Sequence, residues 1–134
     1  MQTLESMLAE ARSGLRRVTA AEIAAAQQRG ALLVDHRDSS DQLAEGMIPG
    51  SISIRRSVLE WRLAPSSEWQ EVMVDADTEI ICVCNDGESS SLAAASLQKL
   101  GLMGATDLIG GYRAWASLPA SVPCAPDDAL SCTT

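Results

Sequence analysis

Aromatic residues are scarce in this sequence, which holds three Trp, one Tyr and no Phe among 134 residues. Aromatic side chains ordinarily supply much of the contact area in a protein core. We therefore expect the core to be built from Leu, Ile, Val, Ala and Met instead. The hydrophobic fraction of 46% is typical of a globular chain, and the length fits one domain.

Basic residues are also few. Ten Lys and Arg stand against eighteen Asp and Glu, which gives a formal net charge of −8. Nucleic acids and anionic membranes bind clustered Lys and Arg, and the pairs Arg16-Arg17 and Arg55-Arg56 are too short to make such a cluster. The sequence therefore predicts no nucleic-acid partner and no membrane partner.

Long apolar runs are absent as well. No stretch approaches the ~20 apolar residues that a membrane-spanning helix needs. Residues 1–17 contain Glu5, Glu10 and Arg12 and lack the continuous apolar segment of a secretory signal. A cytoplasmic location is the expectation that follows.

Cysteine and histidine occur in numbers and spacings that do not suit zinc. The four cysteines are Cys82, Cys84, Cys124 and Cys132, no two of them form a CxxC pair, and there is one histidine. We therefore expect no structural zinc site and no bound metal. In a reducing compartment such cysteines are thiols more often than disulfides.

Helix and strand patterns alternate along the chain. Apolar residues at helical spacing predict an amphipathic first helix from Leu4 to Leu15. A capping box of Thr19 and Glu22 begins a second helix, which ends at Gly30. Short apolar runs predict strands over residues 31–35, 51–54, 79–84 and 106–109. Further helices are expected over residues 40–45, 58–62, 68–72, 90–100 and 112–117.

This alternation predicts an α/β fold with a mostly parallel central sheet and helices on both faces. We divide the chain into an N-terminal amphipathic helix at residues 1–17, one domain at residues 18–118 and an irregular tail at residues 119–134. Functional groups in such folds lie beyond the carboxyl ends of the strands. Cys84 and Asp35 both stand at such ends.

The segment from Cys84 to Ser90 is a loop between a buried strand and a helix. Such a loop can aim backbone N–H groups at the sulfur, and the following helix adds the positive end of its dipole. Both stabilise a thiolate, the reactive form of cysteine. Gly87 permits the backbone angles that the curl needs. On the loop alone two interpretations stay open: a reactive cysteine, or a small buried hydrophobe like Cys82.

Four segments of the chain stand in an order that is more specific than any one of them. They are Leu33-Val34-Asp35-His36-Arg37, Gly46-Met47-Ile48-Pro49-Gly50-Ser51, Cys84-x-x-Gly87-x-Ser89-Ser90 and Leu108-Ile109-Gly110-Gly111-Tyr112-Arg113-Ala114-Trp115. These resemble the Asp-x-Arg strand end, the Gly-His-Ile-Pro-Gly-Ala turn, the active-site loop and the closing Leu-x-Gly-Gly-x-x-x-Trp of rhodanese-homology domains.

The resemblance implies a single rhodanese-like domain and a sulfurtransferase of the thiosulfate:cyanide class. Cys84 would accept sulfane sulfur as a persulfide from thiosulfate or another persulfide donor, and pass it to a thiol, to cyanide or to a protein sulfur acceptor. Asp35 and Arg37 would support the loop, and no metal or organic cofactor is implied. The substrate would be bound by Asn85, Asp86, Gly87, Glu88, Ser89 and Ser90.

The loop departs from the family in its charge. Asp86 and Glu88 flank Gly87, and Ser89 stands where many relatives carry Arg. Thiosulfate is a dianion, and each carboxylate near its entry would oppose it by on the order of 1 kcal/mol at about 4 Å in high dielectric. This charge pattern disfavours thiosulfate as the preferred donor. It also supports an alternative function, a catalytically weak regulatory or protein-binding domain.

Several residues outside the loop are weaker candidates. Arg55, Arg56 and Arg62 follow the second strand and could line the mouth of the site. The favoured alternative is a solvated helical face with Trp61 pointing inward. His36 could act as a base, but a surface or packing role is expected. Cys124 and Cys132 lie in the tail and could resolve a persulfide.

A cysteine phosphatase is a further alternative, because related phosphatases share this architecture. Those enzymes hold phosphate oxygens with a longer loop that ends in Arg. Residues 84–90 contain no Arg or Lys, so the sequence disfavours phosphate-ester hydrolysis.

Overall fold

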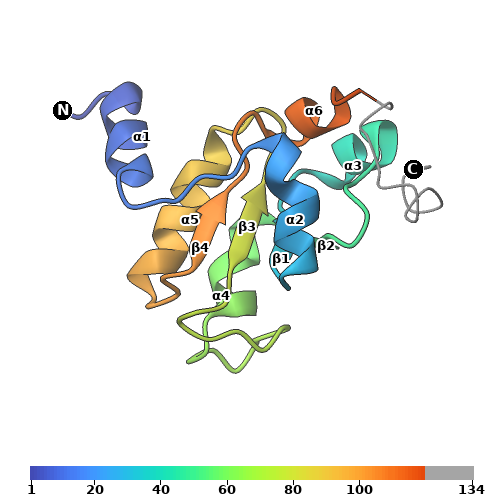
Figure 1. Cartoon of the computed structure of the whole chain (residues 1–134). Helices are drawn as coiled ribbons and strands as arrows, with labels where there is room; N and C mark the ends of the chain where they lie inside the picture. The colour runs from blue at the N-terminus through green and yellow to red at the C-terminus, as the bar shows by residue number, and fades with distance from the viewer. Residues whose placement is uncertain (120–134) are drawn as a thin grey trace.

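Four short parallel strands form the centre of the molecule, for which a computed structural model describes residues 1–119. The strands are β1 (Leu32–Asp35), β2 (Ile52–Ser53), β3 (Ile80–Val83) and β4 (Ala105–Asp107), and they lie in the order β2-β1-β3-β4 (Figure 1). Every neighbouring pair is parallel, so the carboxyl ends of all four strands meet at one edge of the sheet. The predicted α/β architecture is confirmed.

Helices cover both faces of this sheet. They are α1 (Leu4–Arg12), the 3-10 helix η1 (Ala20–Glu22), α2 (Ile23–Gln28), α3 (Ser39–Glu45), the 3-10 helix η2 (Arg56–Val58), α4 (Leu59–Leu63), α5 (Ser89–Lys99) and α6 (Gly111–Ala116). Helices α4 and α5 contribute to the core cluster on one face, and α2 and α6 contribute to the cluster on the other. The expected extra helix α1 packs against α5 (Figure 1). Within residues 1–119, no helix has the length and apolar character to cross a bilayer.

Strand β3 shows why both faces need cover. Ile80 and Cys82 belong to one core cluster, and Ile81 and Val83 belong to the other, as the two-residue period of a strand requires. All four residues are fully buried. The alternation also directs Cys84, which follows the strand, toward the face that carries α5.

The core is aliphatic, as the shortage of aromatic residues predicts, with Tyr112 as the one buried aromatic residue among those described. The expectation that methionine contributes to this core is wrong. Met7, Met73 and Met103 are exposed. Met7 lines an open pocket between α1 and α5, and the other two lie in a loop and in the turn after α5. The buried volume is filled by Leu, Ile, Val and Ala.

Two further expectations fail around α4. The helix predicted over residues 68–72 is absent, and the Ser67 hydroxyl there accepts the Trp69 N–H in a local turn that competes with a helix. Trp61, expected to point inward, is 58% exposed. Leu59 and Leu63, four residues apart and therefore on one helix face, take the core positions instead.

A buried ion pair ties strand β1 to distant parts of the fold. Arg37 Nη2 donates to Asp35 Oδ2 at 2.7 Å and to the Gly46 carbonyl at 2.6 Å. The Arg37 guanidinium also lies 4.0 Å from the centroid of the Tyr112 ring. The Tyr112 hydroxyl in turn donates to the Glu45 carbonyl. The cluster joins the ends of β1 and α3 to helix α6.

Replacing Arg37 by Gln should lower the free energy of unfolding by about 3 kcal/mol, because the Asp35 carboxylate would remain buried without its partner. Both side chains of the pair are only 1% exposed. Arg29→Gln is the matched control, since it removes an exposed pair with Glu79 and should cost less than about 1 kcal/mol. Denaturant unfolding measures both, and equal losses would contradict the prediction.

Candidate active site

Cys84 directly follows strand β3 and lines a cleft at the carboxyl edge of the sheet. The residue is 6% exposed. Its backbone carbonyl accepts the N–H of Tyr112 at 2.8 Å, which ties it to helix α6. The cleft has a cavity volume of about 560 Å³. Its walls come from α1, the segment after β1, α3, η2, the loop after Cys84 and the first turn of α5.

Hydrogen-bonding groups converge on the sulfur of Cys84. The backbone N–H groups of Gly87 and Ser90 lie 3.1 and 3.4 Å from Sγ, and the Ser90 hydroxyl oxygen lies 3.2 Å from it. Ser90 belongs to the first turn of α5, an 11-residue helix. The positive end of that helix dipole therefore also favours negative charge on the sulfur.

Two glycines allow this curled loop to pack. Gly87 has a φ of +84°, and a Cβ built there would lie 2.5 Å from the Gly110 nitrogen. A Cβ on Gly111 would collide with the carbonyl oxygens of Cys84 and Asn85. Larger residues at either position would force the loop away from the turn before α6.

The surroundings of Cys82 and Cys84 shift their thiol pKa values in opposite directions. Burial raises the pKa of Cys84, but hydrogen bonds from the hydroxyls of Ser90 and Ser89 and from the backbone of Ser90 and Gly87 outweigh it, so that the pKa is lowered overall. Burial, aided by the charge of Asp107, raises the pKa of Cys82 well above that of a free thiol. Cys84 is therefore the thiol suited to form a thiolate.

Asp107, at the end of β4, holds the start of α5 beside this sulfur. The carboxylate is fully buried. Its Oδ2 accepts the hydroxyls of Ser90 and Ser91 at 2.7 and 2.8 Å, and its Oδ1 accepts Nε of Arg17 at 2.8 Å. Sequence reasoning missed Asp107, because an aspartate at a strand end carries no local sign of partners that lie 16 to 90 residues away.

Ser90 has one hydroxyl proton, which Asp107 and Cys84 cannot both receive. While Cys84 is a thiol, its S–H can donate to the Ser90 oxygen and the Ser90 hydroxyl can donate to Asp107. Once Cys84 is a thiolate, the hydroxyl stabilises the charge only if it turns toward the sulfur. Asp107 opposes that turn, although Ser91 and Arg17 still satisfy its oxygens.

Two arginines from the N-terminal part of the chain bind the loop at the carbonyl of Gly87. Nη2 of Arg12 and Nη2 of Arg17 donate to the Gly87 carbonyl at 3.0 and 2.9 Å. A trans peptide unit points its N–H opposite to its carbonyl, so the N–H of Glu88 points away from both guanidiniums. The sequence offered no signal for this contact, because residues 12 and 17 lie 70 or more positions before Gly87.

The predicted loop residues gather around the cleft with different partners. Asn85, Asp86, Glu88 and Ser89 all line it. The side chain of Asp86 pairs with Arg113 at 3.0 Å. Glu88 is exposed and forms no ion pair with any residue in the described part of the chain. The negative charge of Glu88 therefore stands uncompensated at the mouth.

Of the three arginines considered for the mouth of the site, Arg56 lines the cleft. Arg62 lies away from the cleft and pairs with Glu71 at 3.7 Å. His36 also lines the cleft and is 7% exposed. Burial, together with the charge of Arg56, lowers the pKa of His36. The imidazole is therefore neutral at pH 7.

The support of the loop by Asp35 and Arg37 stays a prediction. Within residues 1–119, no side-chain hydrogen bond joins this pair to residues 84–90. Arg37 instead stacks on Tyr112, whose N–H donates to the Cys84 carbonyl. Cys124 and Cys132 lie outside the described residues. Over residues 1–119, no cluster of three or more His, Cys, Asp or Glu is placed to hold a metal ion.

Comparisons with known proteins place this site in context. A family model described as "Rhodanese-like domain" matches residues 19–118. Among solved structures, the chain is similar to RPA3614 of Rhodopseudomonas palustris, a protein of unknown function described as a possible tyrosine phosphatase. The two are 30% identical over 93% of this chain and 96% of that one, with a TM-score of 0.77.

Two more solved structures extend the comparison. The human single-domain sulfurtransferase TSTD1 is 25% identical over 77% of this chain and 96% of that one, with a TM-score of 0.64. A rhodanese-related protein of Thermoplasma volcanium is 24% identical over 78% of this chain and 95% of that one, with a TM-score of 0.60, a likeness of fold. The comparison with curated proteins gives no significant match.

Replacing Asp107 by Asn should lower the pKa of Cys84 further. The change removes a nearby negative charge, and the new amide can donate to the Ser90 oxygen and leave the hydroxyl proton for the sulfur. The measurement is the pH profile of Cys84 alkylation by iodoacetamide, read by mass spectrometry. Circular dichroism should verify that the variant folds.

Ser91→Ala is the control, because Ser91 donates to the same Asp107 oxygen without contacting the sulfur. Its alkylation midpoint should match that of the wild type. The other charged groups around the cleft are unchanged in both variants; they are Asp38, Asp41, Arg37, Arg56, Asp86 and Glu88. A folded Asp107→Asn protein with a wild-type midpoint would show that Asp107 does not influence the thiol.

Proposed function

The chain belongs to the rhodanese-like domain family, and on that premise we propose that it is a sulfurtransferase in which Cys84 carries the transferred sulfur. The observation that carries the proposal is the set of hydrogen-bonding groups around Cys84 Sγ. Backbone N–H groups at 3.1 and 3.4 Å and a hydroxyl at 3.2 Å surround a thiol whose pKa is lowered. The sulfurtransferase TSTD1, similar to this chain, supports the same assignment.

The reaction consists of two sulfur transfers. The Cys84 thiolate attacks the sulfane sulfur of the donor, a new S–S bond forms, and the bond between that sulfur and the rest of the donor breaks. The donor leaves with the electron pair of the broken bond. An acceptor nucleophile, such as a thiol or cyanide, then attacks the outer sulfur of the Cys84 persulfide and restores the thiolate.

The chain's own groups assist each transfer electrostatically. The N–H groups of Gly87 and Ser90 stabilise the sulfur anion before attack and after release. No strong general base is required, because the thiolate forms without one. His36, neutral at pH 7, lines the cleft without adding a charge to it.

Hydrolysis of a phosphate ester is the second candidate function, because the similar protein RPA3614 is described as a possible tyrosine phosphatase. Phosphate oxygens are held best by a guanidinium that points into the loop. Residues 84–90 contain no Arg or Lys. The guanidiniums of Arg12 and Arg17 bind the carbonyl of Gly87 instead. Sulfur transfer is therefore the better-supported function.

Cys84→Ser should abolish sulfur transfer, because a serine hydroxyl cannot form a persulfide. Thiocyanate formation from a sulfane donor and cyanide should fall to background, and mass spectrometry should find no added sulfur on the protein. Cys82→Ser should retain activity, since Cys82 is fully buried. A wild-type protein that gains no sulfur from any donor would favour the alternative of a regulatory or binding domain.

The wild-type protein should not hydrolyse p-nitrophenyl phosphate faster than Cys84→Ser does. The reason is the absence of a guanidinium in the loop. Release of p-nitrophenol that Cys84→Ser loses would overturn the choice between the two candidate functions.

A further inference from the structure

Helix α1 lies outside the family domain, whose match begins at residue 19, yet it contributes to the Cys84 cleft. Leu4 and Leu8 of α1 line that cleft together with Leu92 of α5. No residue of α1 is buried, and Leu4 is 63% exposed. The helix therefore keeps apolar surface available beside the reactive sulfur.

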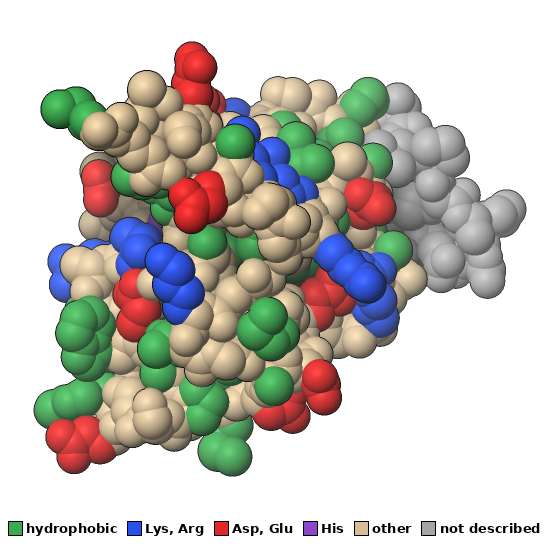
Figure 2. Space-filling model, turned by 90° about the vertical axis from the view of Figure 1, so that its left-hand side faces the viewer, with side chains coloured by type: hydrophobic (Ala, Val, Ile, Leu, Met, Phe, Trp, Pro, Cys, Tyr) green, Lys and Arg blue, Asp and Glu red, His purple; other side chains and the backbone are tan. Residues whose placement is uncertain are grey.

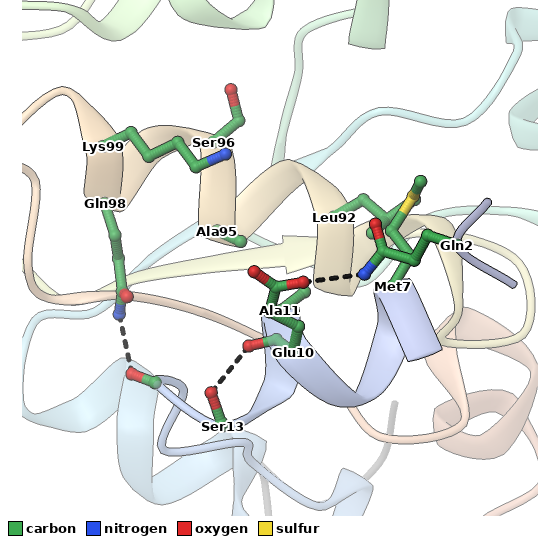
Figure 3. Close-up of a pocket in the computed structure, with 11 residues that line it drawn as sticks. Gln2, Met7, Glu10, Ala11, Ser13, Leu92, Ala95, Ser96, Gln98 and Lys99 are labelled. Carbon is green, nitrogen blue, oxygen red and sulfur yellow. Dashed lines mark hydrogen bonds between the residues drawn. The ribbon is translucent and has the colours of Figure 1, made fainter. Parts of the chain in front are cut away.

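Hydrogen bonds hold the C-terminal end of α1 against the loop and α5. Arg12 donates through Nη2 to the Gly87 carbonyl at 3.0 Å and through Nε to the Ser91 hydroxyl at 2.9 Å. Gln98 of α5 donates to the Gly14 carbonyl at 3.0 Å (Figure 3). These bonds set the position of the helix relative to Cys84.

The two sides of α1 line two different pockets. Met7 and Ala11 face α5 across a second pocket, where Ala95 lies opposite them (Figure 3). Leu4 and Leu8 line the Cys84 cleft instead. In the view from the side of α1 and α5, acidic and basic side chains are interspersed and do not gather into one patch (Figure 2).

We propose that α1 is a substrate-selecting wall, on which Leu4 and Leu8 bind the apolar body of an organic persulfide while its outer sulfur reaches Cys84. This inference rests on the sulfurtransferase function. It names the donor class as R–S–SH with an apolar R group, in preference to the inorganic dianion thiosulfate.

The size and charge of the cleft support this class. A cavity volume of about 560 Å³ lies within the range of sites for small organic ligands, and thiosulfate would leave most of it unfilled. Three carboxylates, Asp38, Asp41 and Glu88, line the cleft without an ion pair to any described residue. The two arginines that line it, Arg37 and Arg56, are each paired with a carboxylate. The charges of the three unpaired carboxylates repel a dianion more strongly than a singly charged or neutral persulfide.

The chemistry balances without an added oxidant or reductant. The Cys84 thiolate attacks the outer sulfur of R–S–SH, and the S–S bond of the donor breaks. The R–S⁻ that leaves takes up a proton from water and becomes R–SH, and Cys84 retains the outer sulfur as its persulfide. The apolar wall contributes binding of R and takes no part in the bond changes.

The test compares Leu8→Ser with Ala9→Ser, which adds the same hydroxyl one residue along α1 at an exposed position. The donors are benzyl persulfide and thiosulfate, and the readout is the KM of each. Leu8→Ser should raise the KM for benzyl persulfide about five-fold, equivalent to about 1 kcal/mol at ~1.4 kcal/mol per factor of ten. It should leave the KM for thiosulfate within about two-fold, and Ala9→Ser should change neither.

Leu4→Ser provides a second variant that removes apolar surface at a largely exposed side chain, so its effect does not depend on packing. Leu4→Ser should also raise the KM for benzyl persulfide. Equal changes for both donors, or no change in either leucine variant, would overturn the role of α1 and leave sulfur transfer standing. A wild-type protein that takes sulfur from neither donor would refute the sulfurtransferase function, and this inference with it.

Discussion

The buried carboxylate of Asp107 is the constraint on which the rest of the site depends. A charge removed from water must be paired and hydrogen-bonded, and Asp107 meets that need with one guanidinium and two hydroxyls. Those hydroxyls belong to the first turn of α5. The same bonds that satisfy the carboxylate therefore set where α5 begins, and with it the N–H groups that face the sulfur.

Local parts of this architecture could be predicted from the sequence. Strand β3 and the loop after it could be predicted because their signals lie in neighbouring residues of the sequence. The capping box of Thr19 and Glu22 forms as expected for the same reason. The division at residues 17 and 118 stays a prediction. The side chain of Trp61 could not be placed, because a five-residue helix offers too little periodicity to define its inner face.

The supporting contacts of the loop could not be predicted for a different reason. Arg12 and Arg17 look like ordinary surface arginines in the sequence, and their shared acceptor is a backbone carbonyl, which has no residue signature. Asp107 is likewise one of eighteen acidic residues. Only the fold brings these groups together, since each contact joins segments that are far apart in the chain.

The hydrogen bonds that Ser90 and Ser91 donate to Asp107 make the reactivity of the Cys84 thiol a property of the completed fold. A nascent chain released only as far as residue 100 contains Cys84 and both serines, but it lacks the carboxylate that orders the start of α5. Its thiol would keep an ordinary pKa of about 8.5 and be mostly protonated at neutral pH. In the finished protein the lowered pKa links thiolate formation to folding, so stability rises with pH between the folded and unfolded values and is lost below the folded one. Incomplete or unfolded chains therefore carry a less reactive cysteine. The thiol becomes reactive only when Asp107, near the C-terminal end of the domain, has bound Arg17 and the first turn of α5.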